Sequence, residues 1–325
     1  MKKLLNTLIV FIFGAILVSC QPRYQYIEDK INITATTNVM ADLANEIGGE
    51  NVSVYALMAA GIDPHQYIAR PSDYTALSKA DMILVSGLNL EGKMTSIFES
   101  YDKQSNKFVL SIGNKILSES SDELKSLLIE DENFGGNYDP HFWFDIDLYK
   151  EAAKYVFEAL KELDNTNASY YEGRLNNYLL ELNTLNEEII LNLSSIENTD
   201  RFLITAHDAF QYFGNKYDFK VYSLQGLSTE DEVSPSDIRE VVSVVKEHNV
   251  KAIFPETSVP VETITSVKEA LSRDGYDVVV GGNLYSDSLG DSDDDNTYIK
   301  MYLKNVNIIL KAFDESKGAW FYGLY

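Results

Sequence analysis

Short apolar runs alternate with amphipathic segments through the first half of the chain. The runs have the length of buried strands and cover residues 31–35, 52–57, 82–86 and 107–110. The segments between them carry helical patterns, at residues 38–47, 71–79 and 91–101. Pro71 opens the second of these helices, at a position where its missing N–H costs nothing. Alternation of this kind predicts a parallel sheet with crossover helices.

The second half of the chain repeats this scheme. Its strand-like runs cover residues 202–206, 219–224, 252–254 and 277–280. Helical patterns follow at residues 209–216, from Ser234 onward, at 261–272 and at 297–313. Ser234 has the features of a helix cap, because Pro235 follows it and Asp237 stands at the third helical position. A second α/β lobe is therefore expected.

The longest uninterrupted pattern lies between the two halves. Leucine and isoleucine recur there at steps of three or four residues, at Leu175, Leu179, Leu182, Leu185, Ile189, Leu193 and Ile196. This stripe predicts a helix from near Asn167 to near Ser195, about 29 residues and about 44 Å long. Such a helix either acts as a strut that spans both lobes and limits their opening, or packs as one more domain helix. We predict an α/β fold of two lobes, each a parallel sheet with crossover helices, at residues 31–166 and 198–325, joined by a linking helix at 167–197.

The first twenty residues are typical of an export signal. Two lysines precede the apolar run Leu8–Val18, whose eleven or so residues are about half the length needed to cross a bilayer. The run ends in Leu17-Val18-Ser19-Cys20, the form of a bacterial lipobox, in which Cys20 is lipidated. An ordinary signal peptide with a chance cysteine is the alternative. We predict a signal peptide at 1–19, a polar tether at 20–30, and a protein exported and lipid-anchored at the cell membrane, on its periplasmic or outer face.

Charge narrows the classes of partner. The 325 residues include 50 acidic and 27 basic ones, which gives a net charge of −23. Such a field repels nucleic acid and anionic lipid headgroups and attracts cations, so no nucleic-acid partner is expected. Acidity also serves solubility, and it therefore supports a cationic ligand only weakly. Because Cys20 is the single cysteine, disulfides do not stabilise the fold and a thiolate zinc site is excluded.

Three of the four histidines lie at strand ends or in proline-bounded loops. The tripeptide Asp-Pro-His occurs twice, ending at His65 and at His141, and His207 ends the first strand of the second half. Asp287 is a carboxylate in the equivalent place after the last predicted strand. Ligands of parallel α/β lobes bind at the carboxyl ends of the strands. The spacing therefore fits one group per loop, two from each lobe, converging on a cleft.

Three imidazoles and one carboxylate form a ligand set for Zn²⁺ or Mn²⁺, with Fe²⁺ ranked behind them. Four protein ligands leave no position for water, which describes a closed site that holds an ion and does not catalyse. For each histidine alone, a hydrogen-bonded loop residue is the alternative. Asp63 and Asp139 either orient the neighbouring imidazoles or cap the turns before proline. Glu256, at a strand end, either faces the cleft or has a capping or surface role, and His248, at a helix end, is interpreted as structural.

Six segments resemble the metal-binding receptors of zinc and manganese ABC importers, the solute-binding family with one rigid helix between its lobes. In the family's order they are Asp63-Pro-His-Gln-Tyr67, Asp139-Pro-His-Phe-Trp-Phe-Asp145, Ala206-His-Asp-Ala-Phe210, Leu224-Gln-Gly-Leu-Ser228, Phe254-Pro-Glu256 and Leu284-Tyr-Ser-Asp-Ser-Leu-Gly290. The resemblance covers nearly the whole mature chain. It implies that the metal ligands are His65, His141, His207 and Asp287. It also implies a monomeric receptor, held at the membrane by Cys20, that delivers its ion to an ABC permease.

The choice between zinc and manganese is less clear from the resemblance. Zinc-specialised members of that family often carry a loop rich in histidine and acids. The corresponding segment, residues 118–136, is acidic but has no histidine, and it is expected to be a surface loop or a poorly packed helix. Its composition weakens the zinc-specialist interpretation.

Two other functions use the same residues. Iron and manganese superoxide dismutases also bind their metal with three histidines and an aspartate, and metallohydrolases use related sets, but these enzymes need an open coordination position. A surface adhesin or scaffold lipoprotein with an incidental metal is the second alternative, in which His65→Ala abolishes metal binding and spares function. Metal-dependent turnover favours the enzyme, and tight binding without turnover favours the receptor. We predict the receptor, and not an enzyme.

Overall fold

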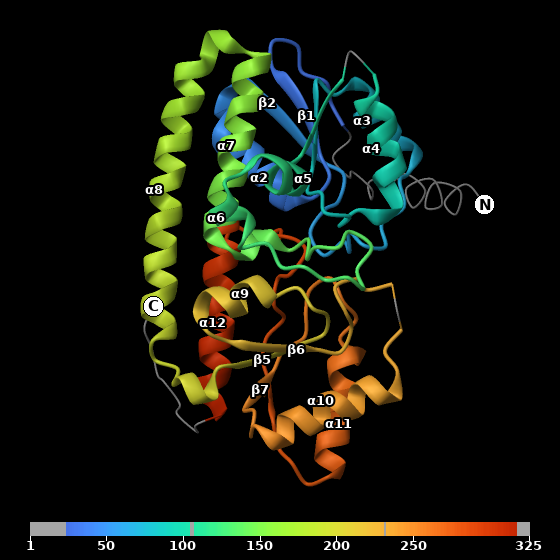
Figure 1. Ribbon diagram of the computed structural model, residues 1–325, viewed down its shortest axis with the longest axis vertical. Coiled ribbons are helices and arrows are strands. Elements are labelled where there is room, and N and C mark those ends of the chain that lie inside the picture. The colour runs from blue at the N-terminus through green and yellow to red at the C-terminus, as the bar shows by residue number, and fades with distance from the viewer. Residues whose placement is uncertain (1–23, 105–106, 231, 317–325) are drawn as a thin grey trace, which may run out of the picture.

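The computed structural model describes residues 24–104, 107–230 and 232–316. They form two lobes, stacked one above the other, with one long helix along a side (Figure 1). The predicted signal peptide and the lipidation at Cys20 lie outside the described residues. Within the described ranges, no helix is long and apolar enough to cross a membrane.

Four parallel strands form the sheet of the first lobe. They are β1 (Ile31–Ala35), β2 (Val52–Ala56), β3 (Met82–Val85) and β4 (Phe108–Ser111), in the order β2-β1-β3-β4. The helices of this lobe are α2 (Asn38–Gly48), α3 (Pro71–Lys79), α4 (Thr95–Asp102), α5 (Ile112–Glu119), α6 (Asp122–Lys125) and α7 (Ile146–Leu163). Short 3-10 helices are η1 (Gly49–Asn51), η2 (Gly92–Met94), η3 (Phe142–Phe144) and η4 (Asn165–Asn167). The parallel sheet with crossover helices is confirmed.

Helix α7 is absent from the sequence-based prediction. Its apolar residues Tyr149, Ala152, Val156 and Leu160 recur at steps of three or four and are buried. Asp145 caps the helix, because its side chain accepts hydrogen bonds from the N–H groups of the second and third helical residues. The helical signal was therefore present in the sequence, directly after the second Asp-Pro-His motif. The acidic segment 118–136 begins inside α5 and contains the one-turn helix α6, followed by turns.

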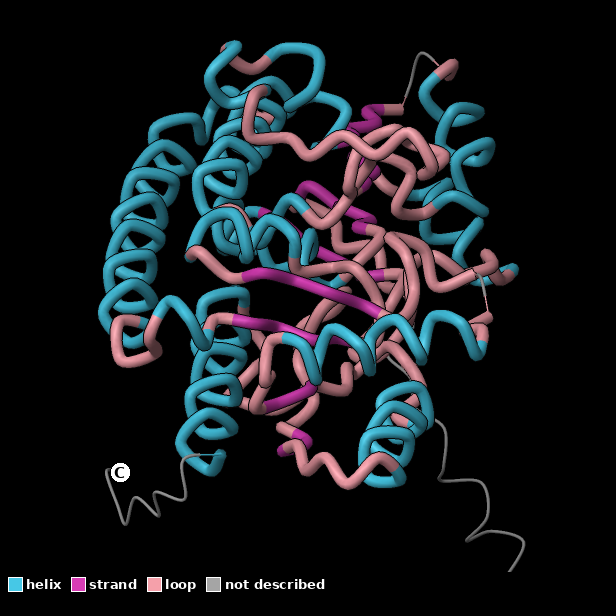
Figure 2. Tube along the Cα trace, turned by 60° about the horizontal axis from the view of Figure 1, so that its bottom comes forward, coloured by secondary structure: helices cyan, strands magenta, loops and turns pink. Residues whose placement is uncertain are grey.

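Two pairs of parallel strands lie in the second lobe. They are β5 (Phe202–Thr205) with β6 (Lys220–Ser223), and β7 (Ala252–Ile253) with β8 (Val279–Val280). A hydrogen bond of 2.8 Å from Phe254 N to Ile204 O places β7 beside β5, and β7 stops before Pro255, which has no N–H to donate. The 3-10 helix η5 (Asn198–Asp200) leads into the lobe, and its helices are α9 (Gln211–Tyr217), α10 (Pro235–Glu247), α11 (Glu262–Arg273) and α12 (Tyr298–Ser316). Figure 2 shows the strands inside and the helices around them.

The predicted long helix is α8 (Ala168–Leu193), with 26 residues and a length of about 39 Å. It packs against α2 and α7 of the first lobe and against α12 of the second (Figure 1). Near its start, the Tyr170 hydroxyl accepts a hydrogen bond from Glu50 N at 3.2 Å. Nearer its end, Asn186 Oδ1 accepts one from the Tyr217 hydroxyl at 3.0 Å. The helix therefore contacts both lobes, as a strut does.

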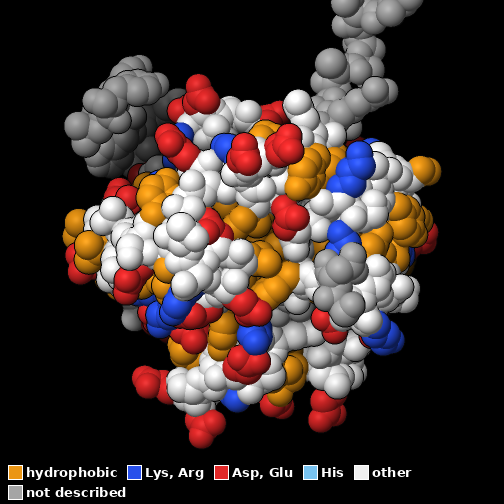
Figure 3. Space-filling model, turned by 90° about the horizontal axis from the view of Figure 1, so that it is seen from above, with side chains coloured by type: hydrophobic (Ala, Val, Ile, Leu, Met, Phe, Trp, Pro, Cys, Tyr) orange, Lys and Arg blue, Asp and Glu red, His pale blue; other side chains and the backbone are white. Residues whose placement is uncertain are grey.

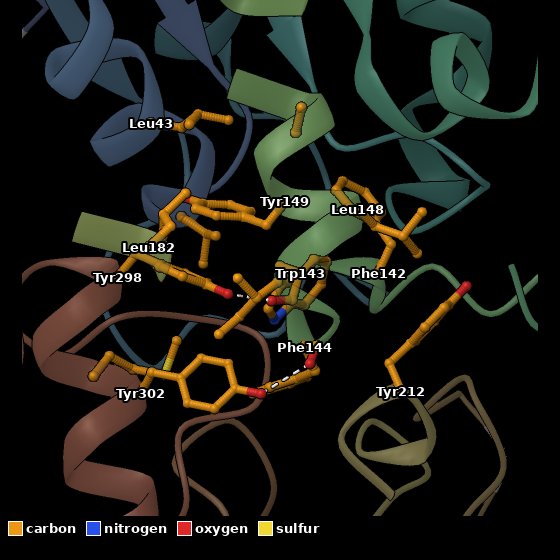
Figure 4. Close-up of a cluster of buried hydrophobic side chains, with 14 of the residues drawn as sticks. Leu43, Phe142, Trp143, Phe144, Leu148, Tyr149, Leu182, Tyr212, Tyr298 and Tyr302 are labelled. Atoms are coloured by element: carbon orange, nitrogen blue, oxygen red, sulfur yellow. Dashed lines mark hydrogen bonds between the residues drawn. The ribbon is translucent and has the colours of Figure 1, made fainter. Parts of the chain in front are cut away.

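An aromatic core joins the two lobes (Figure 4). Tyr298 and Tyr302 of α12 donate hydrogen bonds to the backbone oxygens of Trp143, at 2.6 Å, and Phe144, at 2.8 Å. The rings of Tyr298 and Tyr149 stack with centroids 3.7 Å apart. All five side chains are buried, and the two hydrogen bonds pair the hydroxyls of Tyr298 and Tyr302 where water is absent. This core fixes the segment that carries His141 against the second lobe.

Charged side chains on the molecular surface are mixed with polar and apolar ones. On the face above the first lobe, acidic side chains are scattered, with fewer basic side chains among them (Figure 3). The negative charge is therefore spread over this face, and its attraction for cations acts at long range.

Asp42 of α2 is a second link between the lobes. Its Oδ2 accepts a hydrogen bond of 2.8 Å from Tyr298 N, at the start of α12. Burial raises the pKa of the Asp42 carboxyl to about 7, and nearby Glu46 raises it further, against the opposing effects of this hydrogen bond and of Lys300. In the unfolded chain the carboxyl titrates near its ordinary value of about 4. The folded state therefore holds this proton more tightly, and the contribution of Asp42 to stability declines as pH rises from about 4 to about 7.

We expect Asp42→Asn to raise the melting temperature at pH 8 and to change it little at pH 4. Asparagine keeps an oxygen for Tyr298 N and removes the cost of burying a charge above pH 7. Asp102→Asn, at the exposed end of α4, is the control and should leave the melting temperature nearly unchanged at both pH values. Calorimetry over pH 4–8 measures the effect, and an equal shift at every pH would contradict it.

Candidate metal centre

Four side chains that are far apart in the sequence meet at one point. One ligand atom from each of His65, His141, His207 and Asp287 can be chosen so that all four atoms lie within 4.8 Å of one another. Asp287 Oδ1 lies 3.3 Å from His141 Nε2 and 3.7 Å from His65 Nε2, and Asp287 Oδ2 lies 3.5 Å from His207 Nε2. All four residues are buried, His65 being the most exposed at 3%. The structure brings together the complete set that the sequence suggested.

Four different loops supply these side chains. His65 follows β2 after a loop, and His141 immediately precedes η3. His207 lies two residues beyond the end of β5, and Asp287 lies in the long connection between β8 and α12. Two side chains come from each lobe, so the cluster occupies the junction between them. Loops at the carboxyl ends of parallel strands meet in this way because the strands all point toward the same edge.

Asp139 holds the ring of His141. Its Oδ1 lies 2.7 Å from His141 Nδ1 and also accepts a hydrogen bond of 2.9 Å from the backbone N–H of His141. The sequence left open whether Asp139 orients the ring or caps the turn, and its Oδ1 does both. With its proton on Nδ1, the neutral imidazole presents the lone pair of Nε2 to the cluster.

Glu256 has the same relation to His207 in the second lobe. Its Oε2 lies 2.6 Å from His207 Nδ1, although the two groups are not aligned as a regular hydrogen bond. Its Oε1 accepts hydrogen bonds of 2.8 Å from the backbone N–H groups of Ala206 and His207. Glu256 is 3% exposed and faces the junction of the lobes. Its carboxylate fixes both the strand end and the imidazole attached to it.

Asp63 makes no contact with the ring of its neighbouring histidine. Its Oδ1 accepts a hydrogen bond of 2.9 Å from His65 N, which caps the turn. Its Oδ2 accepts a short hydrogen bond from the hydroxyl of Thr229, in the second lobe, and one of 3.2 Å from Gln66 Nε2. Gln66 also donates to Thr229 O at 3.0 Å. Asp63 thus caps its turn and links the lobes, and Thr229 is a partner that the sequence did not indicate.

The carboxylates of the cluster favour protonation of two of its imidazoles, His141 and His207. Burial lowers the pKa of His141, but Asp139 and Asp287 outweigh it and raise the pKa to about 9. Burial likewise opposes protonation of His207, yet Glu256 and Asp287 raise its pKa well above the ordinary value. Burial would raise the pKa of Asp287, but the surrounding imidazoles, His207 first, hold it well below its usual range. A divalent cation can replace these protons.

The donor atoms fit a transition-metal ion. Three buried carboxylates, Asp139, Glu256 and Asp287, surround three imidazoles, so neutral imidazoles alone would leave net negative charge without water to solvate it. His207 Nε2 and Asp287 Oδ1 are buried without a hydrogen-bond partner and face the same point. Buried polar atoms are normally paired, so a missing partner indicates an ion or a water. Imidazole nitrogen with one carboxylate oxygen suits Zn²⁺, Mn²⁺ or Fe²⁺.

His248, the fourth histidine, lies outside the cluster. It follows the last residue of α10, and its ring stacks on Phe202 with centroids 4.8 Å apart. Ser258 is a contact of the cluster that sequence reasoning missed, since its hydroxyl donates a hydrogen bond of 2.7 Å to Asp287 Oδ2. Its place two residues after Glu256, at the same strand end, was the available signal.

Comparison with known proteins places the chain among metal-binding receptors. The family model described as "zinc-uptake complex component A periplasmic" matches residues 33–312. The manganese-binding lipoprotein MntA of Bacillus subtilis is 35% identical over 289 residues, which cover 88% of this chain and 90% of the relative. The zinc-binding protein TroA of Treponema pallidum is 33% identical over 86% of this chain and 88% of the relative. A solved structure of periplasmic TroA aligns with a TM-score of 0.81 at 32% identity, over 87% of this chain and 99% of that one.

Proposed function

This chain belongs to the family of periplasmic zinc-uptake complex component A proteins, and from that premise we propose that it is an extracytoplasmic receptor for a divalent transition metal. It binds one Zn²⁺ or Mn²⁺ between its lobes and delivers the ion to the permease of an ABC importer. The metal is cargo, which the protein holds and then releases.

The buried cluster of three imidazoles and one carboxylate carries the proposal. His65 and His141 from the first lobe and His207 and Asp287 from the second would each supply one donor atom. Four protein donors satisfy a tetrahedral ion completely, and a site of that kind stores an ion and leaves no position for a substrate. Because the donors come from both lobes, binding ties the lobes together and release requires their separation.

The relatives do not decide between the two metals. One similar protein is named for manganese and another for zinc, at nearly equal identity. Affinity of nitrogen and oxygen sites generally favours Zn²⁺ over Mn²⁺. We propose that the site takes both, with Fe²⁺ as the third candidate.

The proposal also covers the membrane anchor, the oligomeric state and the lobe boundaries. Cys20 would carry the lipid that holds the receptor at the membrane, as the word lipoprotein in the names of relatives suggests for them. The chain would act as a monomer, with lobes at residues 31–166 and 198–325 and a linking helix at 167–197. Because α8 packs on both lobes, we expect metal release through small lobe rotations and local loop movement.

Purified protein is expected to bind one equivalent of Zn²⁺ or Mn²⁺ and to show no metal-dependent turnover. Elemental analysis of protein prepared without added metal, paired with competition titrations against a chelating dye, measures the stoichiometry and the ion preference. Metal-dependent superoxide or ester turnover by the loaded protein would support the enzyme alternative instead. If no ion binds stoichiometrically, the receptor proposal fails.

A further inference from the structure

The two oxygens of Asp287 have different surroundings. Oδ2 accepts a hydrogen bond of 2.7 Å from the hydroxyl of Ser258. Oδ1 has no hydrogen-bond partner and lies near the Nε2 atoms of His141 and His65, at 3.3 and 3.7 Å. Oδ2 also lies 3.5 Å from His207 Nε2, so both oxygens face the imidazoles, but only Oδ2 accepts a hydrogen bond from the protein.

Backbone pairing fixes Ser258 opposite the Asp287 loop. Thr257 N donates to Leu284 O at 2.9 Å, and Leu284 N donates to Pro255 O at 2.8 Å. Ser258 Oγ also lies 3.0 Å from Ser286 Oγ, next to the carboxylate that it contacts. Main-chain hydrogen bonds thus fix the backbone just before Ser258, and from there its hydroxyl reaches the carboxylate of Asp287.

The first lobe supports the same loop. Trp143 Nε1 donates a hydrogen bond of 3.1 Å to Ser286 O, and the Trp143 side chain is 1% exposed. His141, two residues before this tryptophan, is one of the imidazoles nearest Asp287 Oδ1. The position of the carboxylate is therefore fixed relative to both lobes.

We propose that Ser258 is a positioning residue that makes Asp287 bind the metal through Oδ1 alone, and that it thereby favours Zn²⁺ over Mn²⁺. This inference rests on the proposed function of the site. To present both oxygens equally to one ion, the carboxylate must turn, and the Ser258 hydrogen bond opposes that turn. Four single-atom donors suit tetrahedral Zn²⁺. Mn²⁺ prefers six-coordinate, oxygen-rich sites and would gain from a second carboxylate oxygen.

The test compares Zn²⁺ and Mn²⁺ affinities of Ser258→Ala and Ser258→Thr with those of the wild-type protein. Loss of a hydrogen bond to a ligating carboxylate typically costs about 10- to 100-fold in metal affinity. We expect Ser258→Ala to lose about tenfold in Zn²⁺ affinity and about threefold or less in Mn²⁺ affinity. Ser258→Thr, which keeps the hydroxyl, should retain the wild-type ratio. Ser272→Ala, on the exposed side of α11, is the matched control and should bind both ions as wild type does.

X-ray absorption of the zinc-loaded wild-type protein gives a second readout that needs no variant. Four ligands, three nitrogens and one oxygen, are expected, with one further oxygen in Ser258→Ala. Bidentate Asp287 in the wild type, or an unchanged Zn²⁺-to-Mn²⁺ ratio in Ser258→Ala, overturns the inference and leaves the receptor function intact. If the wild-type protein binds neither ion, the proposed function itself fails.

Discussion

Asp287→Ala is expected to lower the affinity for Zn²⁺ and Mn²⁺ at least about a thousandfold, which corresponds to about 4 kcal/mol. Among the residues that the structure describes, Asp287 is the only one whose carboxylate oxygens lie within 4 Å of an Nε2 atom of all three imidazoles, and it supplies negative charge directly beside a bound dication. The variant should therefore bind weakly while its lobes keep their aromatic core. Competition titration with a chelating dye measures the change.

Two further variants sharpen this result. Asp287→Asn keeps the shape of the side chain and one oxygen but removes the charge, and its affinity should fall between those of wild type and Asp287→Ala. Asp293→Ala removes an exposed acid from the same connection and should leave the affinity unchanged. Wild-type affinity in Asp287→Ala would show that the ion binds elsewhere.

Metal affinity is expected to fall at least about tenfold for each unit of pH between 8 and 6. Without metal, the carboxylates of Asp139 and Asp287 overcome burial and raise the pKa of His141 to about 9, and His207 is also raised. Below that pH the ion must displace a proton from each protonated imidazole, so every unit of acidification costs a factor of ten per proton displaced. If the ligand histidines had the ordinary pKa of about 6.5, the metal affinity would hardly change between pH 8 and 7. The slope in that interval therefore distinguishes the buried, carboxylate-paired imidazoles from ordinary ones.

Titration calorimetry in buffers of different ionisation enthalpy measures how many protons the protein releases for each ion that it binds. One or more protons per ion are expected at pH 7. His248→Gln is the control, because His248 stacks on Phe202 away from the cluster. The metal affinity of this variant should depend on pH as that of the wild type does. Equal affinity at pH 7.5 and pH 5 would rule out imidazole donors.

Local patterns in the sequence predicted most of the scaffold. The strands at 31–35 and 82–86 and the helix at 71–79 agree with the structure to within a residue, because apolar runs bounded by turn residues leave few alternatives. The stripe from Leu175 to Leu193 marked the long helix. Helix α7 is missing from the sequence-based prediction although its apolar period is visible in the sequence.

Three of the four candidate ligands could be selected from the sequence because the chain has only four histidines, and Asp287 because it follows the last predicted strand. Their partners were harder to assign. Asp63 and Asp139 have the same sequence context, yet Asp139 contacts its imidazole and Asp63 instead reaches Thr229 across the lobes. Ser258 approaches Asp287 only because the strand-end loops at 255–257 and 284 pair through their backbones. Such contacts depend on how distant segments pack, so the place of Ser258 two residues after Glu256 indicated that it lies near the cluster but not which residue it contacts.

Anomalous diffraction from crystals of the metal-loaded protein, recorded at the zinc and manganese absorption edges, tests the central claim most directly. We expect a single peak between the lobes, about 2.0–2.2 Å from one nitrogen of each of the three imidazoles and from an oxygen of Asp287. A peak beside other side chains would contradict the account. So would the absence of a peak at these four side chains in crystals of protein that carries its ion.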